Sequence, residues 1–236
     1  METGRLRYAS LLTFLIACAL LLTVRLVYLF LADTHRFPIA TVKVVANYEH
    51  ISRQVVENVL SNYFYASFFS LPVGRLQNDL LALDWTKEVY IARIWPDTLK
   101  ITLIEKIPVA IWNDSLITAE GELFNTGKEQ IETNLPHLSG PVHQKTDVLQ
   151  IYEKLSKLLA TYGLQVASLQ LRENLAWELS LTNGVLIRLG KQDLENRLLR
   201  FCRAYPVVFS DKQDKLSSVD LRYSHGMAVQ WKGTSK

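Results

Sequence analysis

Two hydrophobic patterns divide the chain. The first is a nearly continuous apolar run at residues 8–32, with no charge from Tyr8 to Val24, one at Arg25, and none from Leu26 to Ala32. A bilayer core requires about 20 apolar residues in a helix, so this run predicts one transmembrane helix. The second pattern begins at Phe37, where short alternating and helix-periodic segments indicate globular structure.

The charges around the apolar run predict its orientation. Arg5 and Arg7 lie in a short stub, residues 1–7, and favour a cytoplasmic N-terminus with the rest of the chain outside. A cleaved signal peptide with its site at 17–19 and a lipoprotein processed within 15–18 are the alternatives. Residues 17–19 (Ala-Cys-Ala) make a poor cleavage site for a signal peptide. The residues that follow Cys18 remain apolar, whereas a processed lipoprotein normally continues into a polar tether. An uncleaved anchor is therefore favoured over both.

Residues 37–107 form a predicted β-α-α-β-β unit. The β-branched segment 39–46 is typical of a strand, and apolar residues at helical spacing predict one helix after Ser52 and a second opened by Ser70 and Pro72. Segments 89–95 and 99–106 alternate on either side of residues 96–98 (Pro-Asp-Thr), which indicates a β-hairpin. This unit is therefore expected to be a small α+β domain.

Residues 108–232 read as a mostly antiparallel β domain with two helices, and residues 233–236 as a tail. Helical periodicity covers 148–162, closed by Gly163, and 194–205, whereas residues 132–145 read as a loop. The predicted strands are 109–112, 116–119, 122–125, 166–171, 175–181, 185–189, 219–223 and 227–231. The fold class expected for the whole external part is α+β.

The charge balance argues against nucleic-acid binding. The chain has 26 Lys+Arg and 23 Asp+Glu; three of these basic residues and one acidic residue precede Asp33, which leaves 23 against 22. A nearly neutral body lacks the basic surface that a nucleic-acid partner requires. Cys18 and Cys202 are too few for a disulfide framework and have no metal-ligand spacing, so two buried thiols are expected.

A catalytic constellation is not evident in the sequence. It contains none of the usual nucleophile, zinc-protease, phosphate-loop or dinucleotide motifs. Three pairs of potentially reactive residues are more simply explained as solvated side chains of loops and turns than as parts of a metal or catalytic site. They are His137 with His143, Ser224 with His225, and Glu120 with Glu122. We therefore expect no enzyme activity, no metal, no cofactor and no small-molecule substrate.

Two surface features are candidates for partner binding. The last predicted strand, 227–231, has little charge before Lys232, and a final strand often occupies a sheet edge that is open to strand addition. Tyr223 and Trp231 are residue types that anchor interfaces, although they are equally common in sheet cores. On the earlier hairpin, Ile91 and Arg93 share one strand face.

Several longer motifs carry a family resemblance. These are DWTKEV at 84–89, RIWPDTLKI at 93–101, EKIPVAIWN at 105–113, YPV at 205–207, VDLRY at 219–223 and GMAVQW at 226–231. With one anchor, a β-α-α-β-β unit and a β domain, the chain resembles the FtsQ/DivIB family of bacterial cell-division proteins, closest to its proteobacterial type. The resemblance implies that 37–107 is a POTRA domain and 108–232 the family's β domain.

The resemblance also implies a function. It suggests a non-enzymatic scaffold of the divisome, held in the inner membrane by a single pass, with periplasmic domains, at the division septum. The implied direct partners are FtsB and FtsL, with links to FtsK, FtsW, FtsI and FtsN. The terminal strand would receive a strand of FtsB. The implied contact residues in the β domain are Tyr223, Ser224, Gly226, Gln230 and Trp231; those for recruitment by the POTRA hairpin are Glu88, Ile91 and Arg93.

Two further hypotheses remain beside the scaffold. A membrane-anchored POTRA-type chaperone would bind many extended peptides by strand addition, whereas a scaffold would prefer one partner. A tethered hydrolase with a dispersed site would lose turnover when His225 or Glu120 is changed.

Overall fold

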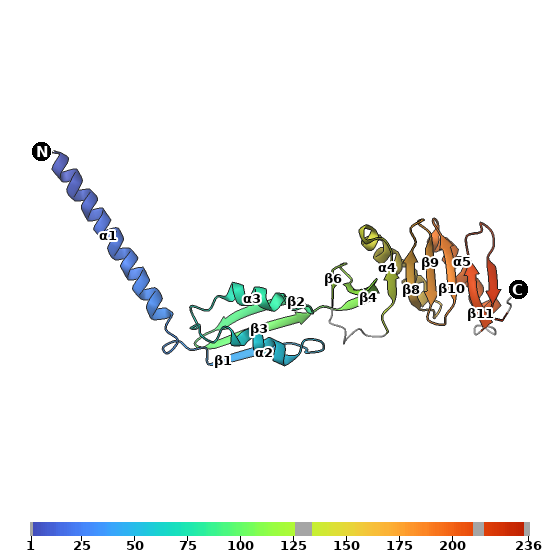
Figure 1. Ribbon diagram of the computed structural model, residues 1–236, viewed down its shortest axis with the longest axis horizontal. Coiled ribbons are helices and arrows are strands. Elements are labelled where there is room, and N and C mark those ends of the chain that lie inside the picture. Colours follow the sequence, from blue (N-terminus) through green and yellow to red (C-terminus); the bar gives the residue numbers. More distant parts are fainter. Residues whose placement is uncertain (1, 126–133, 210–214, 234–236) are drawn as a thin grey trace. The chain divides into compact units, whose positions relative to one another are not determined.

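The computed structural model describes residues 2–125, 134–209 and 215–233, and the chain divides into two compact units, Met1–Lys106 and Ile107–Lys236 (Figure 1). Within the described residues, the first unit has a three-stranded sheet and the second a nine-stranded sheet. The predicted α+β class is confirmed. Most of the predicted tail, residues 234–236, lies outside the described residues.

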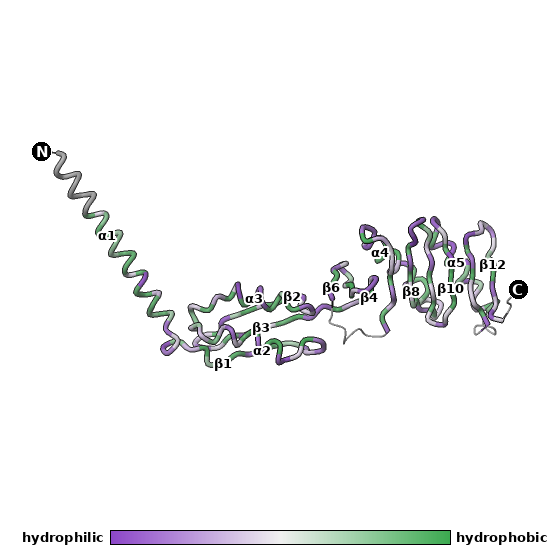
Figure 2. The backbone as a smooth tube through the Cα atoms, in the orientation of Figure 1, coloured by the Kyte–Doolittle hydropathy of each residue, from purple (hydrophilic) through white to green (hydrophobic). Residues whose placement is uncertain are grey.

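The N-terminal helix α1 (Glu2–Leu31) carries a segment that is long and apolar enough to cross a membrane, Leu12–Leu31. Its large apolar side chains are exposed along this length, and Figure 2 shows the apolar colouring continuing to the helix end. Such a surface is unfavourable in water and compatible with lipid. The helix already includes residues 2–7 of the predicted stub, since no proline interrupts its first turns.

The rest of the first unit has the predicted β-α-α-β-β order. Its elements are β1 (Thr41–Val45), α2 (Arg53–Ser61), α3 (Val73–Leu81), β2 (Thr86–Ile94) and β3 (Thr98–Glu105). The spatial order is β1-β3-β2, with β1 parallel and β2 antiparallel to the central β3. Leu76 and Leu80 of α3 are buried, as are Ile101 and Leu103 of β3. One face of the sheet therefore forms the core with the helices.

The two predicted helix starts have different outcomes. Ser52 is the N-cap of α2, and its Oγ accepts a hydrogen bond from the Val55 N–H at 3.3 Å. The interpretation of Ser70 as a cap is wrong: α3 begins at Val73 after Pro72, with no side-chain cap. The Ser70 hydroxyl instead accepts from the N–H of Ser67 at 3.0 Å, which closes the loop that precedes the helix.

The second unit is one long sheet with two helices. Its elements are β4 (Pro108–Trp112), β5 (Ser115–Thr118), β6 (Leu123–Phe124), β7 (His137–Ser139), η1 (Val142–Gln144), α4 (Lys145–Ala160), β8 (Val166–Leu171), β9 (Trp177–Leu181), β10 (Leu186–Gly190), α5 (Leu194–Ala204), η2 (Tyr205–Phe209), β11 (Leu216–Asp220) and β12 (Ala228–Trp231). The strand order is β12-β11-β10-β9-β8-β7-β4-β5-β6. Pairs β10–β11, β4–β7 and β7–β8 are parallel and the others antiparallel, so the prediction of a mostly antiparallel domain is confirmed.

The prediction that residues 132–145 form a loop is wrong in part. It contains β7 and η1, and α4 already starts at Lys145, while residues 132 and 133 lie outside the described residues. β7 pairs in parallel with β4 on one side and β8 on the other, and Leu138 is buried. A central strand of three residues is too short to show alternation, so its stability comes from its two neighbours.

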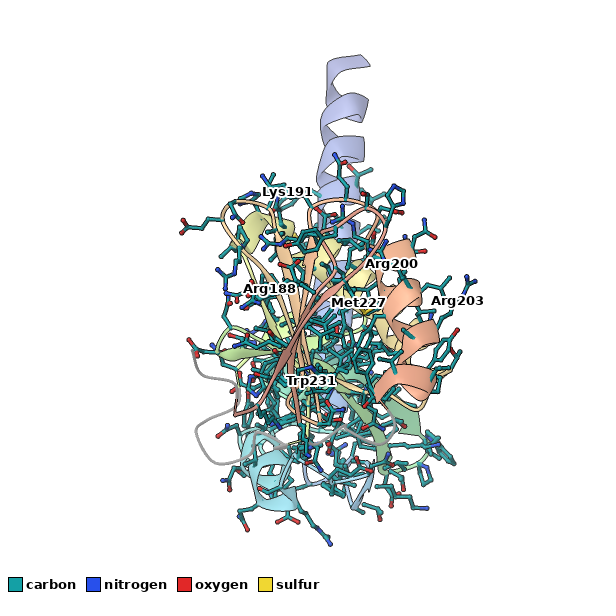
Figure 3. The ribbon with its side chains drawn as sticks, turned by 90° about the vertical axis from the view of Figure 1, so that its right-hand side faces the viewer. Arg188, Lys191, Arg200, Arg203, Met227 and Trp231 are labelled. Atoms are coloured by element: carbon teal, nitrogen blue, oxygen red, sulfur yellow. The ribbon has the colours of Figure 1, made fainter. Side chains whose placement is uncertain are left out.

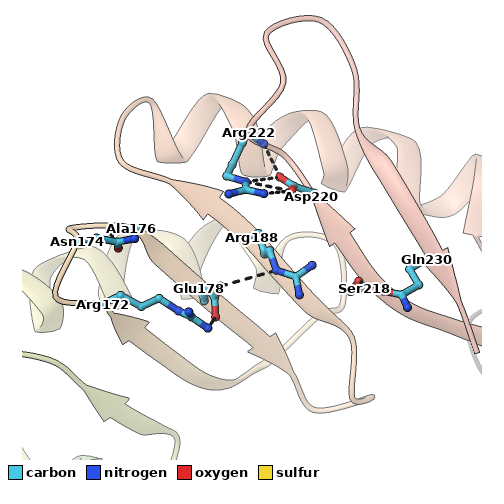
Figure 4. Close-up of polar contacts among 9 residues, drawn as sticks. All are labelled: Arg172, Asn174, Ala176, Glu178, Arg188, Ser218, Asp220, Arg222 and Gln230. Carbon is cyan, nitrogen blue, oxygen red and sulfur yellow. Dashed lines mark hydrogen bonds and ion pairs between the residues drawn. The ribbon is translucent and has the colours of Figure 1, made fainter.

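The core of the second unit lies on one face of its sheet. Leu155 and Leu159 of α4 and Leu198 and Phe201 of α5 are fully buried against inward-facing strand residues. The opposite face carries polar side chains from β9, β10 and β11, several of which contact one another (Figure 4). The sheet thus has an apolar face covered by the helices, which we call the dry face, and a polar face, which we call the wet face.

Candidate partner-binding surfaces

The last strand, β12, lies at one end of the nine-stranded order and, among the described residues, pairs with β11 alone. The Lys232 N–H donates to the Lys215 C=O at 2.6 Å, toward β11. Backbone groups in an antiparallel ladder alternate in direction, so the N–H groups of Gln230 and Ala228 also face β11, whereas those of Val229 and Trp231 face outward. We call this outward row the β12 edge; it belongs to the strand that the sequence predicts at a sheet edge.

Side chains of β12 divide between the two faces of the sheet. Val229 and Trp231 are half-buried and pack against the core, as does Met227 just before the strand. The Trp231 ring lies 6.0 Å from the Phe209 ring. Gln230 lies on the wet face, where its Oε1 accepts a hydrogen bond from Ser218 Oγ at 3.1 Å. Figure 3 faces this edge and labels Met227, which precedes β12, and Trp231, which ends it. Trp231 therefore belongs partly to the core and partly to the edge.

The turn between β11 and β12 presents three of the predicted contact residues. β11 ends at Asp220 rather than at the predicted Tyr223, so Tyr223, Ser224 and Gly226 lie in the turn and are exposed. The Tyr223 side chain is 58% exposed. A shallow hollow of about 400 Å³ is lined by residues 223–228. The turn thus combines an exposed aromatic ring with a surface depression directly beside the β12 edge.

Arg200 of α5 holds this turn in place. Its guanidinium donates to the backbone C=O groups of Leu221 (3.1 Å), Tyr223 (2.9 Å) and Ser224 (2.7 Å). The planar guanidinium has several donors in fixed directions, so one side chain satisfies three carbonyls that the ladder leaves unpaired. Sequence reasoning missed Arg200, because it reads as one more polar position on an amphipathic helix.

An ion pair orders the start of the turn. The Arg222 guanidinium contacts the Asp220 carboxylate at 2.6 Å, and Asp220 also accepts the Arg222 N–H at 3.0 Å (Figure 4). The hydrogen bonds from Arg222 lower the pKa of Asp220. Arg188 and Glu178 lie on the same wet face at 3.7 Å. The β12 end of the wet face is therefore charged, unlike the dry face.

The recruitment residues predicted on the first unit lie on β2, an edge strand of its sheet, but not on one face. Ile91 is half-buried and pairs across from Ile101 on the face that forms the core. Arg93 shares this face and donates to the C=O groups of Leu71 (2.8 Å) and Phe69 (3.4 Å). Glu88 belongs to the opposite face, where its carboxylate accepts the Tyr90 hydroxyl at 2.5 Å. The three residues share a strand edge rather than a surface.

Groups with possible reactivity do not converge. Among the described residues, no three His, Cys, Asp or Glu side chains lie close enough to hold a metal ion. His137 lies in β7, His143 in η1 and His225 in the turn after β11. Cys202 is buried in α5, and this burial raises the pKa of its thiol to about 11. Its thiolate is scarce at neutral pH, so Cys202 is a packing residue rather than a nucleophile.

Comparison with known proteins agrees with this architecture. Residues 37–106 match the POTRA domain of FtsQ type, and residues 110–222 match the C-terminal domain of cell division protein FtsQ/DivIB. The chain is 35% identical over 196 residues to the cell division protein FtsQ of Coxiella burnetii, covering 83% of this chain and 81% of that one. It is 33% identical over 207 residues to the FtsQ of Escherichia coli K12, covering 84% and 75%. The chain belongs to the FtsQ/DivIB family of bacterial cell-division proteins.

Proposed function

We propose that the chain is a scaffold of the divisome that acts by binding alone. Its direct partners are FtsB and FtsL, and it links them to FtsK, FtsW, FtsI and FtsN at the division septum. Residues 1–7 form the cytoplasmic stub, 8–32 the inner-membrane helix, 37–107 the periplasmic POTRA domain, 108–232 the periplasmic β domain and 233–236 the tail.

The observation that carries this proposal is the β12 edge. Its outward N–H and C=O groups offer a ready template for a strand from another chain. No lysine or proline interrupts Ala228–Trp231, which leaves the edge poorly protected against strand addition. A strand of FtsB added here would extend the sheet beyond β12, and backbone hydrogen bonds would supply much of the affinity.

Side chains at the two ends of the edge would select the partner. Tyr223, Ser224 and Gly226 line one end, beside the hollow of the turn, and Trp231 lies at the other. An added strand would therefore meet an aromatic group at each end. Gln230 projects to the wet face, where a polar side chain of the partner strand can reach it.

The POTRA domain would carry a separate contact surface. Glu88, Ile91 and Arg93 lie along the free side of β2, which pairs only with β3 among the strands of its sheet. We place at this strand the contact through which the chain is recruited to the divisome. Residues on both faces of one edge strand would contribute if the incoming chain lies along the edge itself.

The experiment that tests the scaffold uses the full-length chain in lipid nanodiscs. An FtsB-derived peptide should bind, whereas a scrambled peptide of the same composition and unrelated extended peptides should not. Equal binding of all the peptides would replace the scaffold by the chaperone alternative. A correctly folded chain that binds none of them would refute strand addition at this domain.

Arg200 offers a first mutational prediction. Arg200→Met removes three hydrogen bonds to the turn and keeps much of the apolar stem. The turn must then be ordered at the moment of binding, so affinity for the FtsB peptide should fall roughly tenfold. Calorimetric titration measures the change. Arg203→Met is the matched control, because Arg203 is exposed on the same helix, away from the turn (Figure 3). Equal affinity of the two variants would show that Arg200 does not position the turn.

A further inference from the structure

The POTRA domain contacts the end of the membrane-spanning helix directly. The Ser67 hydroxyl, fully buried in the loop between α2 and α3, donates to the C=O of Leu31 at 2.7 Å. In the same region the Phe68 N–H donates to the C=O of Phe37 at 2.8 Å. Leu31 is the last residue of the apolar segment, so the 67–69 loop lies at the boundary of the bilayer when α1 spans it.

Aromatic side chains continue from the helix onto the domain. The Phe37 ring lies 5.6 Å from that of Phe30 and 5.0 Å from that of Phe69, both in edge-to-face arrangements. Arg36 lies over the Phe30 ring at 4.7 Å and pairs with Asp33 at 3.1 Å. Rings with an arginine beside them are typical of the layer where lipid headgroups meet hydrocarbon.

The tip of the β2–β3 hairpin lies at the same end of the domain. The Asp97 C=O in this tip accepts the N–H of Ala40, which stands three residues after Phe37, at 3.0 Å. Arg93, two residues before Trp95, donates to the carbonyls of Phe69 and Leu71. Hairpin tip, loop and helix end are therefore joined by hydrogen bonds into one rim.

Two large aromatic residues at this rim are exposed, and packing of the domain does not explain them. The Trp95 side chain is 78% exposed, and Tyr65, two residues before Ser67, is 69% exposed. Large aromatic groups are normally covered when they serve only to stabilise a domain. Tryptophan is favoured in the interfacial layer, because its ring is apolar and its indole N–H finds polar partners there.

We propose that three aromatic residues at this rim, Trp95, Tyr65 and Phe69, insert into the headgroup layer of the membrane that α1 spans. The partner is a phospholipid surface, because the rim is hydrogen-bonded to the end of the helix that spans the bilayer. With α1 as the first attachment to the membrane and the inserted rim as the second, the POTRA domain is held close to the membrane instead of pivoting on a single helix. This inference rests on α1 spanning the membrane and is independent of FtsB binding.

Tryptophan quenching by brominated lipid tests the proposal on the full-length chain. No tryptophan lies before Trp85, so α1 itself contributes no tryptophan signal. In phosphatidylcholine vesicles brominated near the headgroup end of the acyl chains, the tryptophan fluorescence of the wild-type protein should be quenched. Quenching should be weaker in vesicles whose lipids carry bromine near the terminal methyl. Trp95→Phe should lose most of this quenching, whereas the control Trp231→Phe should keep it.

The outcomes separate the rim from the anchor. Quenching of Trp95→Phe equal to that of the wild type, in protein that floats with the vesicles, would overturn the rim while leaving the anchor intact. Protein that does not float with the vesicles would overturn both. Because Trp95 is largely exposed, its replacement by phenylalanine leaves the fold unchanged, which circular dichroism verifies.

Discussion

Replacing Val229 by proline is expected to weaken binding of the FtsB peptide by about 2 kcal/mol or more, roughly thirtyfold. The Val229 N–H faces away from β11, so proline removes a donor from the open edge and leaves the β11–β12 ladder intact. The carbonyl of the incoming strand then loses its partner in a buried position, which costs more than the bond itself contributes. Calorimetric titration of the full-length chain in nanodiscs measures the loss.

Two companion variants make the result specific. Val229→Ala removes the same half-buried side chain and keeps the N–H, so it should bind much closer to wild type. Ala228→Pro removes a donor that faces β11, so it should lower the free energy of unfolding as well as the affinity. If Val229→Pro and Val229→Ala bind equally well, strand addition at β12 is wrong and the interface lies elsewhere.

The sequence predicted the parts of the fold that local rules decide. The predicted hairpin between β2 and β3 is present, although residues 95–97 connect the two strands and Thr98 already belongs to β3. Ser52 does cap α2. Ser70 has the same local signature as Ser52, yet its hydroxyl is used within the 67–70 loop. The two serines differ in which backbone N–H lies within reach, and that depends on the path of the loop rather than on the residue type.

Tertiary context decides the parts that the sequence missed. β7 is a strand because β4 and β8 hold it from both sides, and three residues carry no periodicity of their own. Arg200 is functional in this proposal because the helix places it beside carbonyls 21 to 24 residues away in the chain. Nothing in the spacing of residues along α5 marks it. An open last strand, in contrast, follows from residue order and low charge.

The surroundings of β12 and its turn also explain why their two aromatic residues could not be assigned from the sequence. Tyr223 and Trp231 bracket the same strand, and both suit an interface or a core. Their surroundings differ: Tyr223 projects from the turn into solvent, whereas Trp231 packs toward Phe209 and the helix-covered face. Separate measurement of binding and stability therefore distinguishes two roles that residue type leaves equivalent.

Tyr223→Ala should reduce affinity for the FtsB peptide by about 2 kcal/mol, in the range of an interface anchor, with the free energy of unfolding changed by no more than about 0.5 kcal/mol. Trp231→Ala should reduce affinity to a similar extent and also lower the free energy of unfolding by about 1–3 kcal/mol, since half of a large ring leaves the core. Chemical denaturation of the reconstituted chain gives the stability, and titration gives the affinity. Trp231→Phe, which keeps a ring against Phe209, should recover most of the stability but not the affinity. A Tyr223→Ala chain that binds like wild type would remove the turn from the interface, and a Trp231→Phe chain that recovers both quantities would assign Trp231 to the core alone.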